Sequence, residues 1–196
     1  RMAAYVQWSW AWLECLRRDA PALQARIEAL LAMTNGYWYT LGAGASLHCQ
    51  IAEMLACVGD RDGAFHHLAM AQQRLDAQTL SGIPLDIAWA SVNGRFGDPG
   101  PTRKRLLELA DATDTAPTLR WRYLLLAAWS AHRAGDRAQA ARDAASGLSA
   151  VAGTGHPAMA DAIEPELAAW ARRLLGRPQP EVPCYVTVFG EFTVRR

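Results

Sequence analysis

The sequence predicts an all-α protein, a right-handed solenoid of antiparallel helical hairpins with a short C-terminal β-hairpin. Apolar residues recur at helical spacing through most of the 196 residues. Three Gly-Asp pairs interrupt these helical segments at a constant interval of 38 residues: Gly59-Asp60, Gly97-Asp98 and Gly135-Asp136. A constant interval of this length is typical of stacked repeats, and each pair fits the tight turn inside one hairpin.

Composition limits the classes of function. No apolar run approaches the roughly 20 residues that a membrane-spanning helix needs, and the charges from Glu14 to Asp19 soon end the apolar stretch near the N-terminus. We therefore expect a cytoplasmic protein without a membrane partner. Proteins that bind nucleic acid usually carry a strongly basic face, and the net charge of +1 does not indicate one here. Because the chain starts and stops within its pattern, we expect a fragment of a longer protein.

The first hairpin is predicted from Tyr5–Leu16 and a second helix that ends near Thr34. Asp19 can cap the second helix, with Pro21 in its first turn. The turn between them does not fall on the 38-residue interval, as expected for an irregular terminal repeat.

Three more regular hairpins follow, each divided by one of the Gly-Asp pairs. Pro84 falls in the first turn of the second of these hairpins, and its inner turn is predicted over Gly97–Pro101. A ninth helix is predicted as one continuous segment, His156–Leu175, without a partner helix in this chain. The remaining helices are predicted over the ranges Tyr39–Val58, Arg61–Gln78, 83–96, 102–110, Pro117–Ala134 and Arg137–Val151.

The domain boundaries follow from a change of composition. Residues 1–176 form the predicted helical-repeat domain, and 177–183 form a linker because its three prolines exclude a helix. Residues 184–196 then carry β-forming side chains on both sides of Gly190-Glu191, which fits a two-residue turn. Since a lone hairpin is marginally stable, we expect the helices or further sequence to cover it.

The repeat resembles the tetratricopeptide family, in which small and large residues recur at fixed helical positions. The 38-residue period exceeds the usual 34 or so, and is similar to the longer repeats in the helical domains of large bacterial regulators of the maltose-activator type. The middle copy departs from the pattern. Aligned on the turn glycine, the residues of the three copies are Ala52, Leu55, Gly59, Ala64, Leu68 and Ala71; Ala90, Asn93, Gly97, Thr102, Leu106 and Leu109; Ala128, Ala131, Gly135, Ala140, Ala144 and Gly147.

The C-terminal segment from Val186 to Arg196 resembles the first two strands of the winged-helix domain of the Streptomyces antibiotic regulatory protein family. An apolar strand, a Gly-x-Phe turn and a Val-Arg strand carry this resemblance. It implies that a DNA-binding domain begins at residue 184 and continues beyond Arg196. Because the recognition helix would lie beyond that residue, this chain alone should not read DNA bases.

The resemblance to tetratricopeptide arrays implies that the first helix of each hairpin lines a concave groove. Polar residues on these helices are then the candidates for binding a protein or small-molecule effector. Arg122, His132 and Arg133 are suited to a carboxylate or phosphate, although a solvated helix face is the alternative for each candidate. The candidates are Gln50, Glu53, Ser91, Arg95, Arg122, Trp129, His132 and Arg133.

Other motifs favour structural roles. The run 42–46 lacks the Lys-Ser/Thr end of a phosphate-binding loop and fits close helix packing. The adjacent His66 and His67 cannot share a metal as an i, i+4 pair would, so we expect one solvated and one packed histidine. The four cysteines lack zinc spacing and are interpreted as reduced thiols. We predict no catalytic set, no metal and no cofactor.

The leading hypothesis is therefore a sensor or protein-interaction domain of a bacterial transcriptional regulator. A ligand or partner in the groove would change the packing of the repeats and so control an adjacent DNA-binding domain. The alternative is a stand-alone adaptor that binds a peptide or partner helix. The hypothesis of an enzyme ranks last. The sequence does not decide whether the protein forms homo-oligomers or whether a nucleotide-binding switch domain precedes it.

Overall fold

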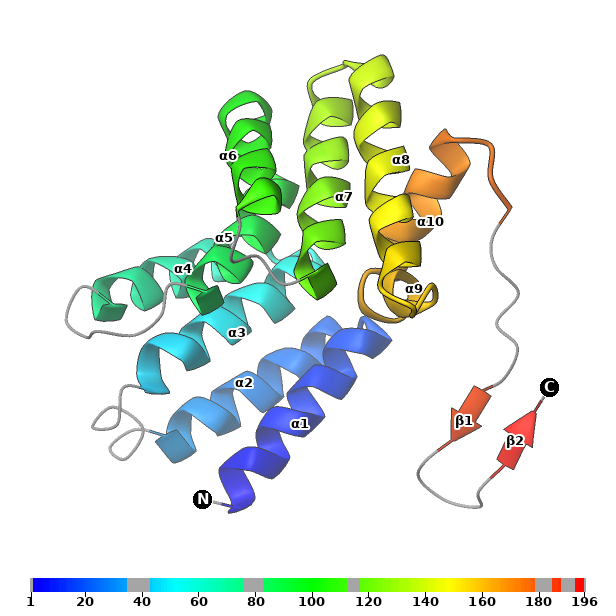
Figure 1. The fold of residues 1–196 in the computed structure, drawn as a ribbon. Helices are drawn as coiled ribbons and strands as arrows, with labels where there is room; N and C mark the ends of the chain where they lie inside the picture. The colour runs from blue at the N-terminus through cyan, green and yellow to red at the C-terminus, as the bar shows by residue number, and fades with distance from the viewer. Residues whose placement is uncertain are drawn as a thin grey trace.

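The computed structural model describes residues 2–34, 43–75, 83–112, 117–178, 185–187 and 193–195. The part that it describes up to residue 178 is built from ten helices, so the predicted all-α class is confirmed (Figure 1). The helices are α1 (Met2–Arg17), α2 (Ala20–Thr34), α3 (Ala43–Val58), α4 (Arg61–Leu75), α5 (Ile83–Phe96), α6 (Pro99–Asp111), α7 (Pro117–Arg133), α8 (Arg137–Gly153), α9 (Met159–Ile163) and α10 (Pro165–Leu174).

The helices pack in chain order (Figure 1). The pairs α1–α2, α3–α4 and α7–α8 each turn back at a short connection and pack side by side, whereas α6 packs more closely on α7 than on α5. One apolar cluster draws its side chains from α1 to α5, and a second draws from α5 to α10. Trp89 packs against both clusters, so α5 joins the two halves of the core.

Two predicted Gly-Asp turns have the same backbone geometry. Gly59 and Gly135 have positive φ values of 88° and 83°, which close α3 and α7 in the left-handed conformation that favours glycine. Asp60 and Asp136 then cap the next helix through side-chain bonds to the amides of Gly63 and Gln139, at 3.0 and 2.8 Å. Each pair therefore ends one helix and begins the next.

The first hairpin has the same turn, which the sequence pattern did not reveal. Arg18 has a positive φ of 60° and occupies the position of the glycine. Its neighbour Asp19 accepts from the amide of Ala22 at 3.0 Å, as predicted for a helix cap. The amide of Asp19 bonds to the carbonyl of Glu14, five residues earlier, as Asp60 and Asp136 do in their own turns.

The turn at Gly97 is shorter than predicted. Residues Pro99 to Pro101 belong to α6 and not to the turn. Asp98 caps this helix by accepting from the amide of Gly100 at 3.2 Å. Prolines suit this position because the first turn of a helix leaves its N–H groups without intrahelical partners.

The prediction of one continuous helix over His156–Leu175 is wrong. The chain forms the short α9, leaves helical geometry at Glu164, where φ is −131° and ψ is 58°, and restarts as α10. Pro165 explains the break, since its ring disfavours helical geometry in the preceding residue and it lacks a backbone N–H. The interruption turns Glu164 into the interior of the protein, where it is 1% exposed.

Near the C-terminus, strands β1 (Tyr185–Thr187) and β2 (Thr193–Arg195) pair in antiparallel register, with Val186 opposite Val194. Several predictions lie outside the described residues: the turn at Gly190-Glu191, most of the 177–183 linker, Cys184 and the helix ends at 39–42 and 76–78.

Among the helices that are described, none combines the length and apolar character needed to cross a membrane.

Candidate functional site

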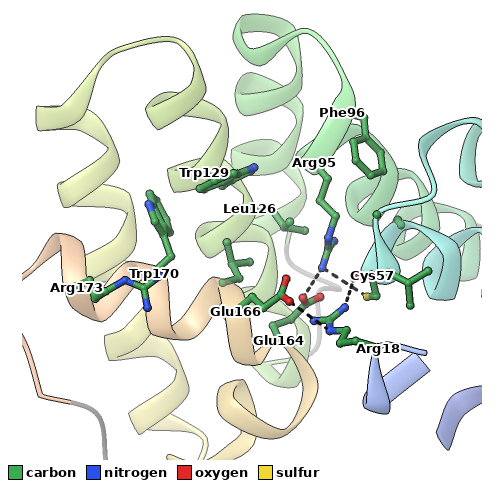
Figure 2. A pocket seen from close by; sticks show the side chains of 14 residues that line it. Arg18, Cys57, Arg95, Phe96, Leu126, Trp129, Glu164, Glu166, Trp170 and Arg173 are labelled. Atoms are coloured by element: carbon green, nitrogen blue, oxygen red, sulfur yellow. Dashed lines mark hydrogen bonds and ion pairs between the residues drawn. The ribbon is translucent and has the colours of Figure 1, made fainter. Parts of the chain in front are cut away.

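Four charged side chains from distant parts of the sequence meet at the centre of the molecule. Arg122 of α7 donates from Nε to Glu164 Oε1 at 2.7 Å, and its Nη1 donates to Glu53 of α3. Arg95 of α5 donates from Nη2 to the other oxygen of Glu164 (Figure 2). Glu164 thus bridges two arginines. We refer to Glu53, Arg95, Arg122 and Glu164 as the charge cluster.

The charge cluster is buried and electrically balanced. Glu164 and Arg122 are 1% and 5% exposed. Burial alone would raise the pKa of Glu164, but Arg95 and Arg122 lower the pKa of this carboxyl below its ordinary value. Burial likewise opposes the charge of Arg122, yet Glu53 and Glu164 raise the pKa of its guanidinium well above the usual value. Arg95, Arg122 and Glu164 therefore stay ionised at neutral pH.

A cavity of about 550 Å³ opens beside the charge cluster, between α3, α5, α7 and α10. Its polar side carries Arg18, Arg95 and Glu166, and its apolar side carries the rings of Trp129 and Trp170 (Figure 2). The two indole rings meet edge to face with centroids 5.0 Å apart. The volume lies in the range of sites that hold small organic molecules.

A second cavity, of about 370 Å³, is lined by side chains of α1 and α3 and of the α9–α10 junction. Cys57 and Arg18 line both cavities. Arg18 also donates from Nη1 to the carbonyl of Cys57, and its Nε lies 3.7 Å from the carboxylate of Glu166. Within the described part of the chain, its buried Nε nevertheless has no hydrogen-bond partner.

The structure brings five of the predicted groove residues to the interior. Glu53, Arg95 and Arg122 belong to the charge cluster. Ser91 is completely buried, and its backbone carbonyl accepts from Arg95 Nη1 at 3.0 Å. Gln50 accepts from the indole Nε1 of Trp8. Four of these five side chains are therefore paired within the chain, whereas the buried Ser91 hydroxyl has no hydrogen-bond partner among the described residues.

The other three predicted residues lie nearer the surface. Trp129 lines the larger cavity. His132 is exposed and stacks near both Trp129 and Trp170, with ring centroids 5.4 and 5.3 Å away. Arg133 points elsewhere, because its Nη2 donates to the carbonyl of Gly97 at 2.8 Å.

Sequence reasoning missed Glu164, Trp170 and Arg18 as members of this site. The Glu164-Pro165 pair carried a usable signal, because a proline inside a helical pattern predicts a break at the residue before it. No comparable signal shows that the freed carboxylate reaches two arginines on other helices.

A separate polar pair joins α3 to α4. The Nδ1 atoms of His48 and His67 lie 2.8 Å apart, and both rings are buried, whereas His66 is exposed as predicted. Burial and the neighbouring histidine lower the pKa of His48 to about 4, and burial and His66 lower the pKa of His67 to about 4. In the part of the chain that the structure describes, no three His, Cys, Asp or Glu residues gather as a metal site.

Comparisons with protein-family models, curated proteins and solved structures found no match for this chain.

Proposed function

We propose that this chain is the sensor domain of a bacterial transcriptional regulator that acts in the cytoplasm, and that α1 to α8 form a superhelical array of hairpins. Support for the array comes from the turns at Arg18, Gly59 and Gly135, which share left-handed geometry and an aspartate cap. The helices also pack in chain order, as expected where each repeat contacts its neighbours.

The observation that carries the sensor proposal is the position of Glu164. Its carboxylate reaches Arg95 and Arg122 on the helices that would line the concave groove. We expected Arg122 to bind the carboxylate of a ligand, and in the structure it binds the carboxylate of Glu164 instead. Glu164 immediately precedes α10, and the chain continues from α10 towards the β1 and β2 strands. Occupancy of this arginine site is thus coupled to the segment that enters the proposed DNA-binding domain.

A small carboxylate ligand would compete with Glu164. Its acid group would pair with Arg95 beside the 550 Å³ cavity, while a flat apolar part would pack on Trp129 and Trp170. The protein then has two states, one with Glu164 bound to the arginines and one with Glu164 released. A ligand shifts the population towards the released state only if it binds that state more tightly than the other. In that state α10 is no longer held by the charge cluster, and the attached domain changes its access to DNA.

The DNA-binding part of the proposal depends on the sequence resemblance of residues 186–196 to the opening strands of a winged helix. The antiparallel pairing of β1 with β2 supports it. A recognition helix beyond Arg196 is required for base contacts.

Fluorescence anisotropy with duplex DNA tests the function. We compare this chain with one extended by about 100 downstream residues, a typical domain length, over a range of salt concentrations. Sequence-selective, salt-sensitive binding by the extended chain alone is the expected result. A stop codon shortly after Arg196, or no binding by either chain, would overturn the regulator proposal and favour a peptide-binding adaptor.

A matched pair of variants tests the coupling. In the extended chain, Glu164→Gln should change the DNA affinity by about 5-fold or more, the lower end of ordinary allosteric coupling. Glu108→Gln removes a carboxylate of α6 whose side chain is 49% exposed and lines neither cavity, and it should leave the affinity nearly unchanged. If the two variants have the same DNA affinity, the Glu164 contact does not control DNA binding.

A further inference from the structure

Cys57 occupies an unusual position for a buried cysteine. It lies near the end of α3, is 9% exposed, and lines both the 550 Å³ and the 370 Å³ cavities. Arg95 Nη2 donates to its sulfur at 3.5 Å (Figure 2). The thiol is therefore reachable by a small molecule and has a guanidinium beside it. These are the surroundings of reactive cysteines, whereas inert structural cysteines are enclosed by apolar side chains.

A second thiol lies next to it. Cys15 of α1 lines the 370 Å³ cavity together with Cys57, and the two thiols lie near enough to influence each other's pKa. Cys15 is 2% exposed, and its sulfur lies 3.6 Å from the carbonyl of Met54. The two cysteines are 42 positions apart in the sequence and belong to different hairpins.

The surroundings give the two thiols different charge states. The neighbouring Cys15 thiol and the charge of Arg95 lower the pKa of Cys57 to about 7, against the opposing effect of burial. The neighbouring Cys57 thiol and burial raise the pKa of Cys15. The surroundings therefore favour the thiolate form of Cys57 and the thiol form of Cys15.

We propose that Cys57 is a peroxide-reactive thiol with Cys15 as its resolving partner, so that a hydroperoxide converts the pair into a disulfide that joins α1 to α3. The inference depends on the two thiols, their cavities and the Arg95 guanidinium, and it does not require the proposed regulatory function.

The chemistry proceeds in two steps. The Cys57 thiolate attacks one oxygen of the hydroperoxide, an S–O bond forms, the O–O bond breaks, and an alcohol or water leaves after taking up a proton. The Cys15 sulfur then attacks the Cys57 sulfur, the S–S bond forms, the S–O bond breaks, and hydroxide leaves as water with the proton of Cys15. In total two thiols lose two electrons, and the hydroperoxide is reduced to an alcohol, or to water for hydrogen peroxide, with one further water released.

Cys49 supplies an internal control on the same helix. It is 2% exposed, lines neither of these cavities, and burial raises the pKa of its thiol to about 11. It should therefore react much more slowly than Cys57, although both residues belong to α3.

The test treats the fully reduced chain with hydrogen peroxide at pH 7.4, blocks the remaining thiols and maps the products by peptide mass spectrometry. Two of the four thiols should disappear, with the Cys15–Cys57 cross-link as the product. Cys15→Ser should trap Cys57 as a sulfenic acid that dimedone labels. Cys57→Ser should slow oxidation of Cys15 by about tenfold or more, and Cys49→Ser should leave the cross-link unchanged.

Circular dichroism of each variant shows whether it is folded, and the wild-type peptide map does not depend on any variant. Oxidation that reaches Cys49 as fast as Cys57, or a product without the Cys15–Cys57 cross-link, would overturn the proposal. Cross-linking that occurs equally fast in urea would also overturn it, because the folded site would then have no role.

Discussion

Arg122 and Glu164 lie 42 positions apart in the sequence and meet in the protein interior, where Arg122 Nε donates to Glu164 Oε1 at 2.7 Å. The contact ties α7 to the junction between α9 and α10. Because Glu164 also accepts from Arg95, one carboxylate holds the C-terminal helices against both α5 and α7. This single side chain therefore has consequences for stability as well as for the proposed function.

Replacing the bridging carboxylate should be costly. Glu164→Gln leaves two buried guanidinium groups with one carboxylate between them, and we expect a loss of about 3 kcal/mol in the free energy of unfolding. Urea denaturation followed by circular dichroism measures it. The matched variant Glu166→Gln changes an exposed carboxylate and should lose less than about 0.5 kcal/mol. Similar losses in both variants would contradict this account.

The buried histidine pair predicts a pH dependence. The pKa values of His48 and His67 in the folded protein are about 4, below the ordinary value of 6.5. The unfolded chain therefore binds more protons between pH 6.5 and 4, and acid favours unfolding in this window. The histidine contribution to stability should be complete above pH 7, and stability should fall by up to about 1.4 kcal/mol per pH unit for each histidine as the pH decreases towards 4.

Urea midpoints measured from pH 8 to pH 4 test this dependence. The double variant His48→Gln with His67→Gln should flatten the curve between pH 6.5 and 4.5. His156→Gln, at an exposed position, should not. Glu164 contributes in a lower window, because its pKa lies below the ordinary 4.5 in the folded state. Its contribution is present above that value and is lost as the pH falls through the folded pKa.

Helix packing between α7 and α8 depends on Gly147. A Cβ atom added there would lie 2.7 Å from Leu125 Cδ2 and 3.2 Å from the Leu125 amide nitrogen. We expect Gly147→Ala to lower the free energy of unfolding by about 1–3 kcal/mol. In the same helix, the added Cβ of Gly153→Ala meets no atom of the described residues within 4 Å, and this variant should stabilise the protein by up to about 1 kcal/mol. Thermal unfolding distinguishes the two, and equal shifts would contradict close packing at Gly147.

Substitutions in the turn between α7 and α8 measure the cost of backbone strain and the cost of losing a helix cap separately. Gly135→Ala introduces no clash but forces alanine to a φ of 83°, and it should cost about 1–2 kcal/mol. Gly135→Asn should cost less, because asparagine tolerates this conformation better. Asp136→Ala removes the cap on the Gln139 amide and should cost about 1 kcal/mol. Urea denaturation measures all three variants, and an equal cost for alanine and asparagine would contradict the strain argument.

The helices and most of their ends were predictable because their causes are local. Helical spacing of apolar residues, a left-handed glycine and an aspartate cap all act within a few residues of one another, as at Gly59-Asp60 and Gly135-Asp136. The break at Glu164 was also local in origin, since Pro165 causes it, but the amphipathic pattern across it favoured one continuous helix. The turn at Arg18 escaped prediction because an arginine takes the glycine's place.

The candidate site was predicted only in part. The expected polar face of the first helices did identify Glu53, Arg95 and Arg122, but it did not indicate that they bind one another and Glu164. Such contacts join positions 42 and 69 residues apart, and local patterns do not encode which distant side chains meet. The sequence by itself determined the helices, their caps and their apolar faces. Only the tertiary structure decided that the arginines receive an internal carboxylate and that Cys57 lies beside Cys15, because both outcomes depend on how the helices pack.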